Sequence, residues 1–345
     1  MKTLVIILSE TRAHELTFDN FKKNVLDELD ADLCVCIGIK PEYDYENPFY
    51  KTAKYKFVYN EPDDYGDAYE EAYKELSPLN REENPLHWRE FLKIKDQFLG
   101  GIKGENQHPG SAGILIFFRW FLLKKLMEKD LLRKYDRFIV TRSDYMYQLP
   151  HPPLEILDEK SIWVPDEEHY GGYTDRHAIL TRDNITSYLN ILNNFVLKSN
   201  DYYNKLKDHE WNLERIIKFN LEEEKQNVRE FPYVMYAVRS KETGTRWSEG
   251  DYSKDLGYYI KYKTEFDASS KYKKEFEESG LSLSDFYKKS IAIEGFQVKS
   301  GSSSCHFSIL LVLFITGIIL INSYNLKEFM LPFVSFFVLI LPFNI

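Results

Sequence analysis

Cysteine is scarce in this sequence: the 345 residues include Cys34, Cys36 and Cys305 and no others. Three cysteines cannot build a disulfide framework. Cys34 and Cys36 stand two apart on an expected strand, too close for a usual disulfide and without the spacing of a metal site. We interpret them as reduced core residues, which favours a domain that faces the cytosol.

Dense clusters of basic residues are also absent. Lys and Arg number 45 against 54 Asp and Glu, which gives a net charge of −9. Neutralising nucleic-acid phosphates requires clustered lysine and arginine, so we expect no nucleic-acid partner. With 43% apolar and 29% charged residues, the chain is long enough and apolar enough to bury a sizeable core.

A dinucleotide-binding fingerprint is missing too. The glycine-rich stretch GGIKGENQHPGSAG, residues 100–113, follows an expected helix instead of a strand and lacks the Gly-x-Gly-x-x-Gly spacing. It does lead into a second expected helix, whose free backbone N–H groups favour an anion, with Ser111 as a candidate cap. A flexible connector is the alternative interpretation.

Short apolar runs rich in β-branched residues predict strands over 2–8, 32–39, 56–59, 138–141, 161–164, 178–181 and 231–238. Helical spacing of apolar residues predicts helices over 18–29, 86–99, 114–129, 184–197 and 211–219. The first strand, helix and strand form a βαβ unit, which implies parallel strands joined by a right-handed crossover. The chain is therefore expected to adopt an α/β fold.

Charge disappears only near the C-terminal end. Residues 307–321 and 329–345 are apolar, and each run is slightly short of the roughly 20 residues that span a bilayer. We predict a membrane-anchor region of one or two helices over 307–345, after a linker over 301–306, and a membrane-associated protein with a cytosolic catalytic domain. The alternative is that this tail is an artefact of the gene model.

The stretch from Tyr135 to Tyr147, YDRFIVTRSDYMY, combines a buried strand with an abrupt polar end. Arg142, Ser143 and Asp144 directly follow the apolar residues 138–141. In open α/β sheets, ligands bind just outside the carboxyl ends of the strands. A carboxylate there can hold a divalent cation and an arginine can pair with phosphate. A strand that ends in a salt-bridged loop is the alternative.

In their order along the chain, these motifs resemble those of nucleotide-sugar glycosyltransferases of the GT-A type. The likeness lies in HPGSAG (108–113), a helix and a strand ending in Thr141–Asp144, then YGGYTDRH (170–177) and Asn212–Glu214. It covers about residues 2–238 and is greatest to viral and bacterial polysaccharide-synthesis members. It implies a Rossmann-type mixed, mostly parallel sheet flanked by helices, as a catalytic domain over 1–240 with an accessory segment over 241–300 packed on it.

One departure from this pattern affects the chemistry. An ordinary Asp-x-Asp motif supplies two carboxylates, but Arg142 takes the first position and Asp144 stands alone. The resemblance implies that Asp144 binds Mn²⁺ or Mg²⁺ on the donor phosphates, with water and diphosphate as further ligands. Arg142 is interpreted either as a phosphate clamp that takes over part of this neutralisation or as a structural ion pair.

The resemblance also assigns roles to other positions. Donor binding falls to Thr11, Arg12, Gly110, Ser111, Gly113, Arg142, Ser143 and Asp144, and acceptor binding to Gly171, Gly172 and Tyr173. Asp175 is the candidate general base that deprotonates an acceptor hydroxyl, with Glu214 and Asp166 in reserve. A turn-capping Asp175 paired with Arg176 is the alternative.

The function expected from these residues is transfer of a hexosyl or deoxyhexosyl group. The donor is a nucleotide-diphosphate sugar, the acceptor is a hydroxyl of a glycan or another molecule, and a metal assists. Two other classes stay open: another nucleotide-dependent enzyme such as a nucleotidyltransferase, and a non-catalytic membrane-tethered binding module.

Overall fold

The computed structural model describes residues 1–104, 108–240 and 250–301. The chain divides into two compact units, Met1–Ser290 and Ile291–Ile345. In the described ranges, no helix is both long and apolar enough to cross a bilayer. The predicted anchor over 307–345 lies outside the described residues, as does the linker before it apart from Gly301.

A seven-stranded sheet forms the centre of the first unit, in the order β3-β2-β1-β4-β7-β6-β8. Six of these strands run parallel, and β7 runs antiparallel to its neighbours β4 and β6. The strands are β1 (Thr3–Ser9), β2 (Asp32–Ile39), β3 (Tyr55–Asn60), β4 (Arg137–Thr141), β6 (Ser161–Pro165), β7 (Ala178–Thr181) and β8 (Asn227–Phe231). This confirms the predicted α/β fold with a mixed, mostly parallel sheet flanked by helices.

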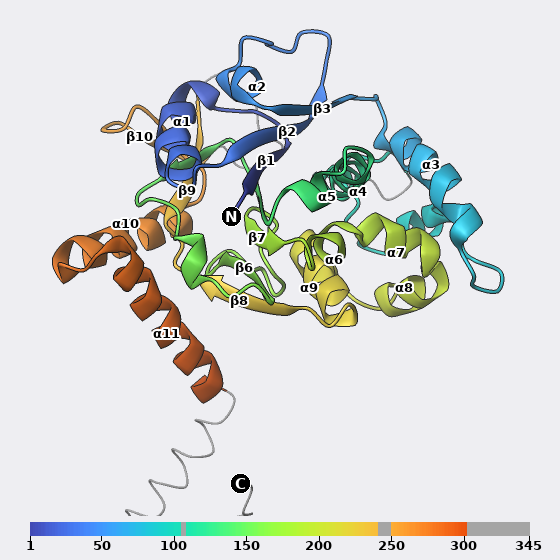
Figure 1. The fold of residues 1–345 in the computed structure, drawn as a ribbon. Coiled ribbons are helices and arrows are strands. Elements are labelled where there is room, and N and C mark those ends of the chain that lie inside the picture. The colour runs from blue at the N-terminus through green and yellow to red at the C-terminus, as the bar shows by residue number, and fades with distance from the viewer. Residues whose placement is uncertain (105–107, 241–249, 302–345) are drawn as a thin grey trace, which may run out of the picture. The chain divides into compact units, whose positions relative to one another are not determined.

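Helices cover the large sheet (Figure 1). Leu4, Ile6 and Leu8 of β1 lie in one apolar core with side chains of α3, α4 and α6 to α9. The helices are α1 (His14–Phe21), α2 (Pro48–Thr52), α3 (Tyr65–Leu76), α4 (Ala112–Glu128), α5 (Leu131–Lys134), α6 (Ile185–Leu189), α7 (Ile191–Leu197), α8 (Ser199–Leu206), α9 (Leu213–Glu223), α10 (Lys263–Ser279) and α11 (Leu283–Gly301). Helix α4 is apolar nearly all round because it is buried between the sheet and α6 and α7.

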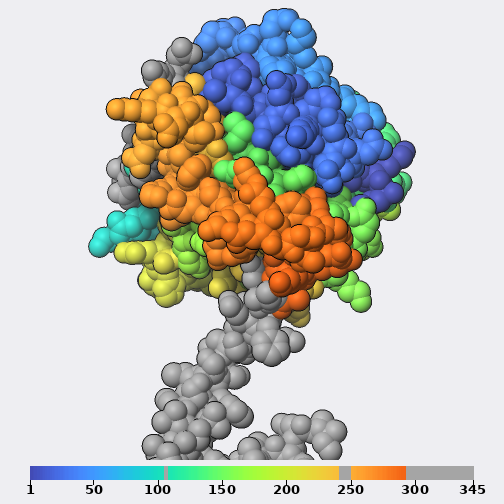
Figure 2. Space-filling view, turned by 90° about the vertical axis from the view of Figure 1, so that its left-hand side faces the viewer, coloured from blue at the N-terminus to red at the C-terminus, as the bar shows by residue number. Residues whose placement is uncertain are grey.

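A second, smaller sheet has the order β10-β11-β9-β5. Its strands are β5 (Tyr145–Tyr147), β9 (Met235–Arg239), β10 (Asp251–Ser253) and β11 (Tyr258–Ile260). Val238 and Tyr236 of β9 share a small core with Ala13, and Leu16, Ile260 and Phe266 pack against it. On one face of the molecule, β10, β11 and α10 lie next to N-terminal residues (Figure 2).

Most predicted elements lie within a few residues of the observed ones, and three differ. The predicted helix over 86–99 is wrong: only Trp88–Lys93 forms a 3-10 turn, and Ile94 is already extended with ψ 132°. The strand over 231–238 is two strands, because Pro232 has no N–H to donate and the chain changes sheets there. The helix over 184–197 is interrupted at Asn190.

Candidate active site

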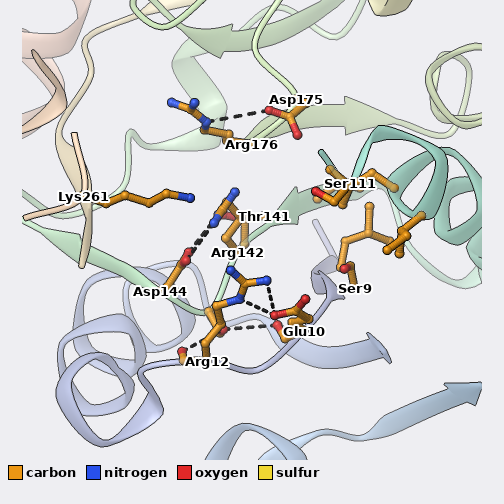
Figure 3. Close-up of a pocket in the computed structure, with 15 residues that line it drawn as sticks. Ser9, Glu10, Arg12, Ser111, Thr141, Arg142, Asp144, Asp175, Arg176 and Lys261 are labelled. Atoms are coloured by element: carbon orange, nitrogen blue, oxygen red, sulfur yellow. Dashed lines mark hydrogen bonds and ion pairs between the residues drawn. The ribbon is translucent and has the colours of Figure 1, made fainter. Parts of the chain in front are cut away.

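A cleft lies at the carboxyl ends of β1 and β4, where an α/β sheet binds ligands (Figure 3). It encloses about 760 Å³ of space when its open mouth is included. Its lining is Leu8, Ser9, Glu10, Arg12, Ser111, Ile114, Leu115, Val140, Thr141, Arg142, Ser143, Asp144, Asp175, Arg176 and Lys261.

The loop after β1 forms one wall. Ser9 adopts a positive φ of 78°, which turns the chain sharply at the end of the strand. The Ser143 hydroxyl donates to the carbonyl oxygens of Glu10 and Arg12, at 3.2 and 3.1 Å, and ties this loop to the end of β4. Arg12 forms an ion pair with Glu10, so its guanidinium stays in the cleft wall.

Asp144 is almost completely buried and accepts hydrogen bonds from two arginines. Arg142 donates through Nε to Oδ1 at 2.8 Å and through Nη2 to Oδ2 at 2.7 Å, a bidentate pair. Arg239 also donates to Oδ2. Burial opposes the charge of Asp144, but Arg142 and Arg239 outweigh it and hold the pKa of this carboxyl well below its usual range.

This arrangement does not fit the metal predicted at Asp144. Both carboxylate oxygens are engaged by guanidinium groups, which would repel a divalent cation. Within the described residues there is also no cluster of three His, Cys, Asp or Glu side chains that could hold a metal. We therefore derive no step through Mn²⁺ or Mg²⁺, and their involvement stays a prediction.

The small sheet brings Lys261 to the same place. Tyr145 of β5 lies opposite Ala237 of β9, and the Lys261 backbone N–H donates to the Ala237 carbonyl at 2.9 Å from the other side. Tyr145, Ala237 and Lys261 therefore lie side by side across the small sheet. In Figure 3, the Lys261 side chain extends into the cleft toward Arg142.

Asp175 and Arg176 form the opposite wall. They precede β7, and because β7 is antiparallel, its beginning lies at the edge where β4 ends. Arg176 donates to Glu168 at 2.8 Å and to Glu265 of α10 at 2.7 Å, while its Nε is 3.8 Å from Asp175. Arg176 is thus held mainly by the two glutamates, and Asp175 is not its principal partner.

Glu214 lies close to Asp175 because the chain at Gly172 packs directly against the start of α9. A Cβ at Gly172 would lie 2.0 Å from the Glu214 backbone, and the Tyr173 N–H donates to the Glu214 carbonyl at 3.0 Å. Burial and then the charge of Asp175 raise the pKa of Glu214 to about 7. This pair of carboxylates is the kind of site that moves a proton near neutral pH.

Several predicted site residues are not in the cleft lining. A Cβ at Gly113 would meet the Gly100 carbonyl at 2.8 Å, and a Cβ at Gly100 would meet the Gly110 carbonyl at 2.1 Å, so Gly113 and Gly100 allow the two segments to pack closely. Thr11 Oγ1 is hydrogen-bonded to the Tyr43 hydroxyl at 2.8 Å.

The remaining three predicted residues also have other neighbours. Asp166 accepts from the Tyr233 N–H at 2.8 Å and from the Tyr272 hydroxyl, which uses both its carboxylate oxygens. Gly171 and Tyr173 adjoin α9, where the cations of Arg215 and Lys218 lie against them. Of the predicted residues, the cleft brings together Arg12, Ser111, Arg142, Ser143, Asp144 and Asp175.

Sequence reasoning missed Lys261 and Arg239. Arg239 is fully buried at the end of β9, and Lys261 is 9% exposed. A charged residue at the end of an apolar strand is a signal that could have singled out Arg239, as it did Arg142. Lys261 stands among many lysines and tyrosines without a comparable signal.

Comparisons with known proteins add little to this geometry. No protein-family model and no curated protein sequence matches the chain. Among solved structures, the apo form of mouse xyloside xylosyltransferase 1 is similar with a TM-score of 0.34 and 9% identity, covering 66% of this chain and 84% of that one. Likeness of this degree assigns neither a family nor an activity.

Proposed function

We propose that this protein transfers a sugar from a nucleotide-diphosphate donor to an acceptor hydroxyl. The observation that carries the proposal is that the cleft holds two arginines, beside Glu10 and Asp144, on one wall and the carboxylate of Asp175, beside Arg176, on the other. Arg12 and Arg142 lie at the ends of β1 and β4, and Asp175 with nearby Glu214 lies across from them. A diphosphate is bound by arginine side chains, and a hydroxyl nucleophile needs a carboxylate that accepts its proton.

In this proposal, the donor diphosphate binds between Arg12, Arg142 and the N-terminal end of α4 at Ser111. Asp175 accepts the proton of the acceptor hydroxyl, and the resulting oxygen forms a bond to the anomeric carbon. The bond from that carbon to the diphosphate oxygen breaks, and the electron pair stays on the leaving diphosphate. Arginine side chains fixed beside it stabilise the charge that develops.

Glu214 assists through Asp175. Its pKa of about 7 means that it exchanges a proton near neutral pH. Arg119 of α4 donates from Nη2 to the Asp175 carbonyl at 3.1 Å and to the Tyr188 hydroxyl at 3.4 Å. These bonds fix the backbone at Asp175, so its carboxylate has a defined position across from the arginines.

The test is a screen of the full-length chain against a panel of nucleotide-diphosphate sugars, with release of the nucleoside diphosphate as the readout. We expect turnover of at least one donor, and Asp175→Asn should lower its rate by about 10²–10⁴-fold. Asp183→Asn, an exposed carboxylate, serves as the matched control and should keep the full rate.

Two outcomes would contradict this proposal. Binding of a nucleotide sugar without turnover, unaffected by Asp175→Asn, would indicate a binding module. Release of pyrophosphate from a nucleoside triphosphate and a sugar phosphate, without sugar transfer, would indicate a nucleotidyltransferase.

A further inference from the structure

Lys261 places its side-chain amine in the cleft without a carboxylate partner among the described residues. The residue is 9% exposed, and its Nζ lies 4.9 Å from the centre of the Tyr262 ring. In the part of the chain that the structure describes, no ion pair joins this Nζ to Asp or Glu. Burying an amine without a counter-charge is costly, so a residue placed in this way calls for an anion that comes from outside the chain.

The groups around Lys261 are cationic as well. Burial, followed by the charges of Arg142 and Arg239, lowers the pKa of Lys261 to about 6. Asp144, a carboxylate that lines the same cleft, already accepts two hydrogen bonds from Arg142 and one from Arg239. This end of the cleft therefore carries more positive than negative charge, and a multiply charged anion would complete it.

We propose that Lys261 binds the donor diphosphate directly, and that Lys261, Arg142 and Arg12 neutralise it without a divalent metal. This inference rests on the proposed function and adds how the leaving group is recognised. Three observations support it: a buried amine in the cleft with no carboxylate partner among the described residues, the two arginines beside it, and a carboxylate at Asp144 whose oxygens are occupied.

The chemistry requires no proton from Lys261. As the bond from the anomeric carbon to the diphosphate breaks, its electron pair remains on the phosphate oxygen. The bound diphosphate raises the pKa of Lys261, so the amine takes up a proton from solvent on binding, and the resulting ammonium donates hydrogen bonds to that oxygen. The fixed cations thus supply the charge stabilisation that a bound metal would otherwise supply.

Binding of UDP, GDP and inorganic pyrophosphate to the full-length chain, measured by calorimetry in EDTA and then with Mn²⁺, tests the inference. We expect binding in EDTA, with the affinity changed by less than about twofold when Mn²⁺ is added. Lys261→Met should weaken binding by about tenfold or more, because a charge-assisted hydrogen bond is lost.

Two further variants control for folding and for charge. Lys263→Met removes an exposed lysine of α10 that pairs with Asp267, and it should leave the affinity within about twofold. Lys261→Arg keeps a cation in the cleft, so it should bind more tightly than Lys261→Met.

Three results would overturn the inference. Equal binding by wild type and Lys261→Met would show that Lys261 does not bind the diphosphate. Binding that is lost in EDTA and restored by Mn²⁺ would show that a metal is required, while leaving the proposed function standing. No binding of any of these anions, with or without Mn²⁺, would overturn the proposed function together with the inference.

Discussion

Two carboxylates, one on a wall of the cleft and one beside the opposite wall, have pKa values that are shifted in opposite directions. On the β4 wall, Asp144 is surrounded by guanidinium groups, and its pKa is held well below the usual range. On the β7 wall, burial and Asp175 raise the pKa of Glu214 to about 7. The difference follows from which elements converge: arginines at the ends of β4 and β9 reach Asp144, whereas the close approach at Gly172 brings Asp175 near Glu214.

The two carboxylates are therefore suited to different chemical roles. A carboxylate that stays ionised at every physiological pH orients cations, and it fixes Arg142 for an anion. A carboxylate that titrates near neutrality can take up and release a proton. Substitutions that remove the charges on one wall, or that make the two walls more alike, test this difference.

Removing the Asp144 charge should have the largest effect. Asp144→Asn leaves Arg142 and Arg239 without their counter-charge in a buried site, so we expect a loss of about 3–5 kcal/mol in the free energy of unfolding. Denaturant titration measures it. Asp267→Asn, which breaks an exposed pair with Lys263, should cost less than about 1 kcal/mol. Equal effects of the two substitutions would show that the β4 wall is not the ion-pair centre described.

Separating Asp175 and Glu214 should have the second-largest effect. In Gly172→Ala, the new Cβ would overlap the Glu214 backbone, so α9 must move away. We expect a loss of about 1–3 kcal/mol in the free energy of unfolding and a lower rate of sugar transfer. At Gly104 the nearest atom to a new Cβ is 3.7 Å away, and Gly104→Ala should leave both unchanged. An unchanged transfer rate in Gly172→Ala would show that sugar transfer does not depend on the close approach of the two segments at Gly172.

Lys261→Met should stabilise the fold while it weakens binding. The pKa of Lys261 is about 6 in the folded chain and near 10.5 when unfolded, so the unfolded state holds more protons between these values. Stability of the wild type therefore rises with pH across this window. The variant removes that dependence and should be more stable than wild type at pH 7, with the gain shrinking toward pH 10. Denaturant titration at both pH values checks this, and a loss of stability would contradict it.

Glu214→Gln should have the smallest effect on stability. The folded pKa of Glu214, about 7, is above its ordinary value of 4.5, so the folded state holds more protons between them. Wild-type stability therefore falls as pH rises through this window. The variant should gain about 1 kcal/mol at pH 8 and almost nothing at pH 4.5, after allowance for partial exposure. Glu222→Gln, exposed on the same helix, should show no such pH dependence.

Strands β1, β2, β4, β6 and β7 could be predicted because each is a short apolar run that is buried along most of its length, whereas β8 (NVREF) is partly exposed and was not predicted. Asp32–Ile39 and Ala178–Thr181 were predicted with their observed ends. The antiparallel direction of β7 could not be predicted, because it depends on which neighbours a strand pairs with. That direction is what brings Asp175 to the edge where Arg142 and Asp144 lie.

The site was predictable only where its residues follow a strand directly. Arg142 and Asp144 follow β4, and Arg12 is in the loop after β1. Arg239 lies 95 residues beyond Asp144, and Lys261 reaches the cleft through the register of β9 and β11. Gly172 was predicted to bind the acceptor, yet in the structure its close neighbour is the backbone of Glu214.

The affinity for a nucleoside diphosphate, measured side by side on Asp175→Asn and Lys261→Met, tests the division between the two walls most directly. The account predicts that Asp175→Asn binds within about twofold of wild type, while Lys261→Met binds about tenfold or more weakly. Equal weakening by both variants, or weakening by Asp175→Asn alone, would contradict it.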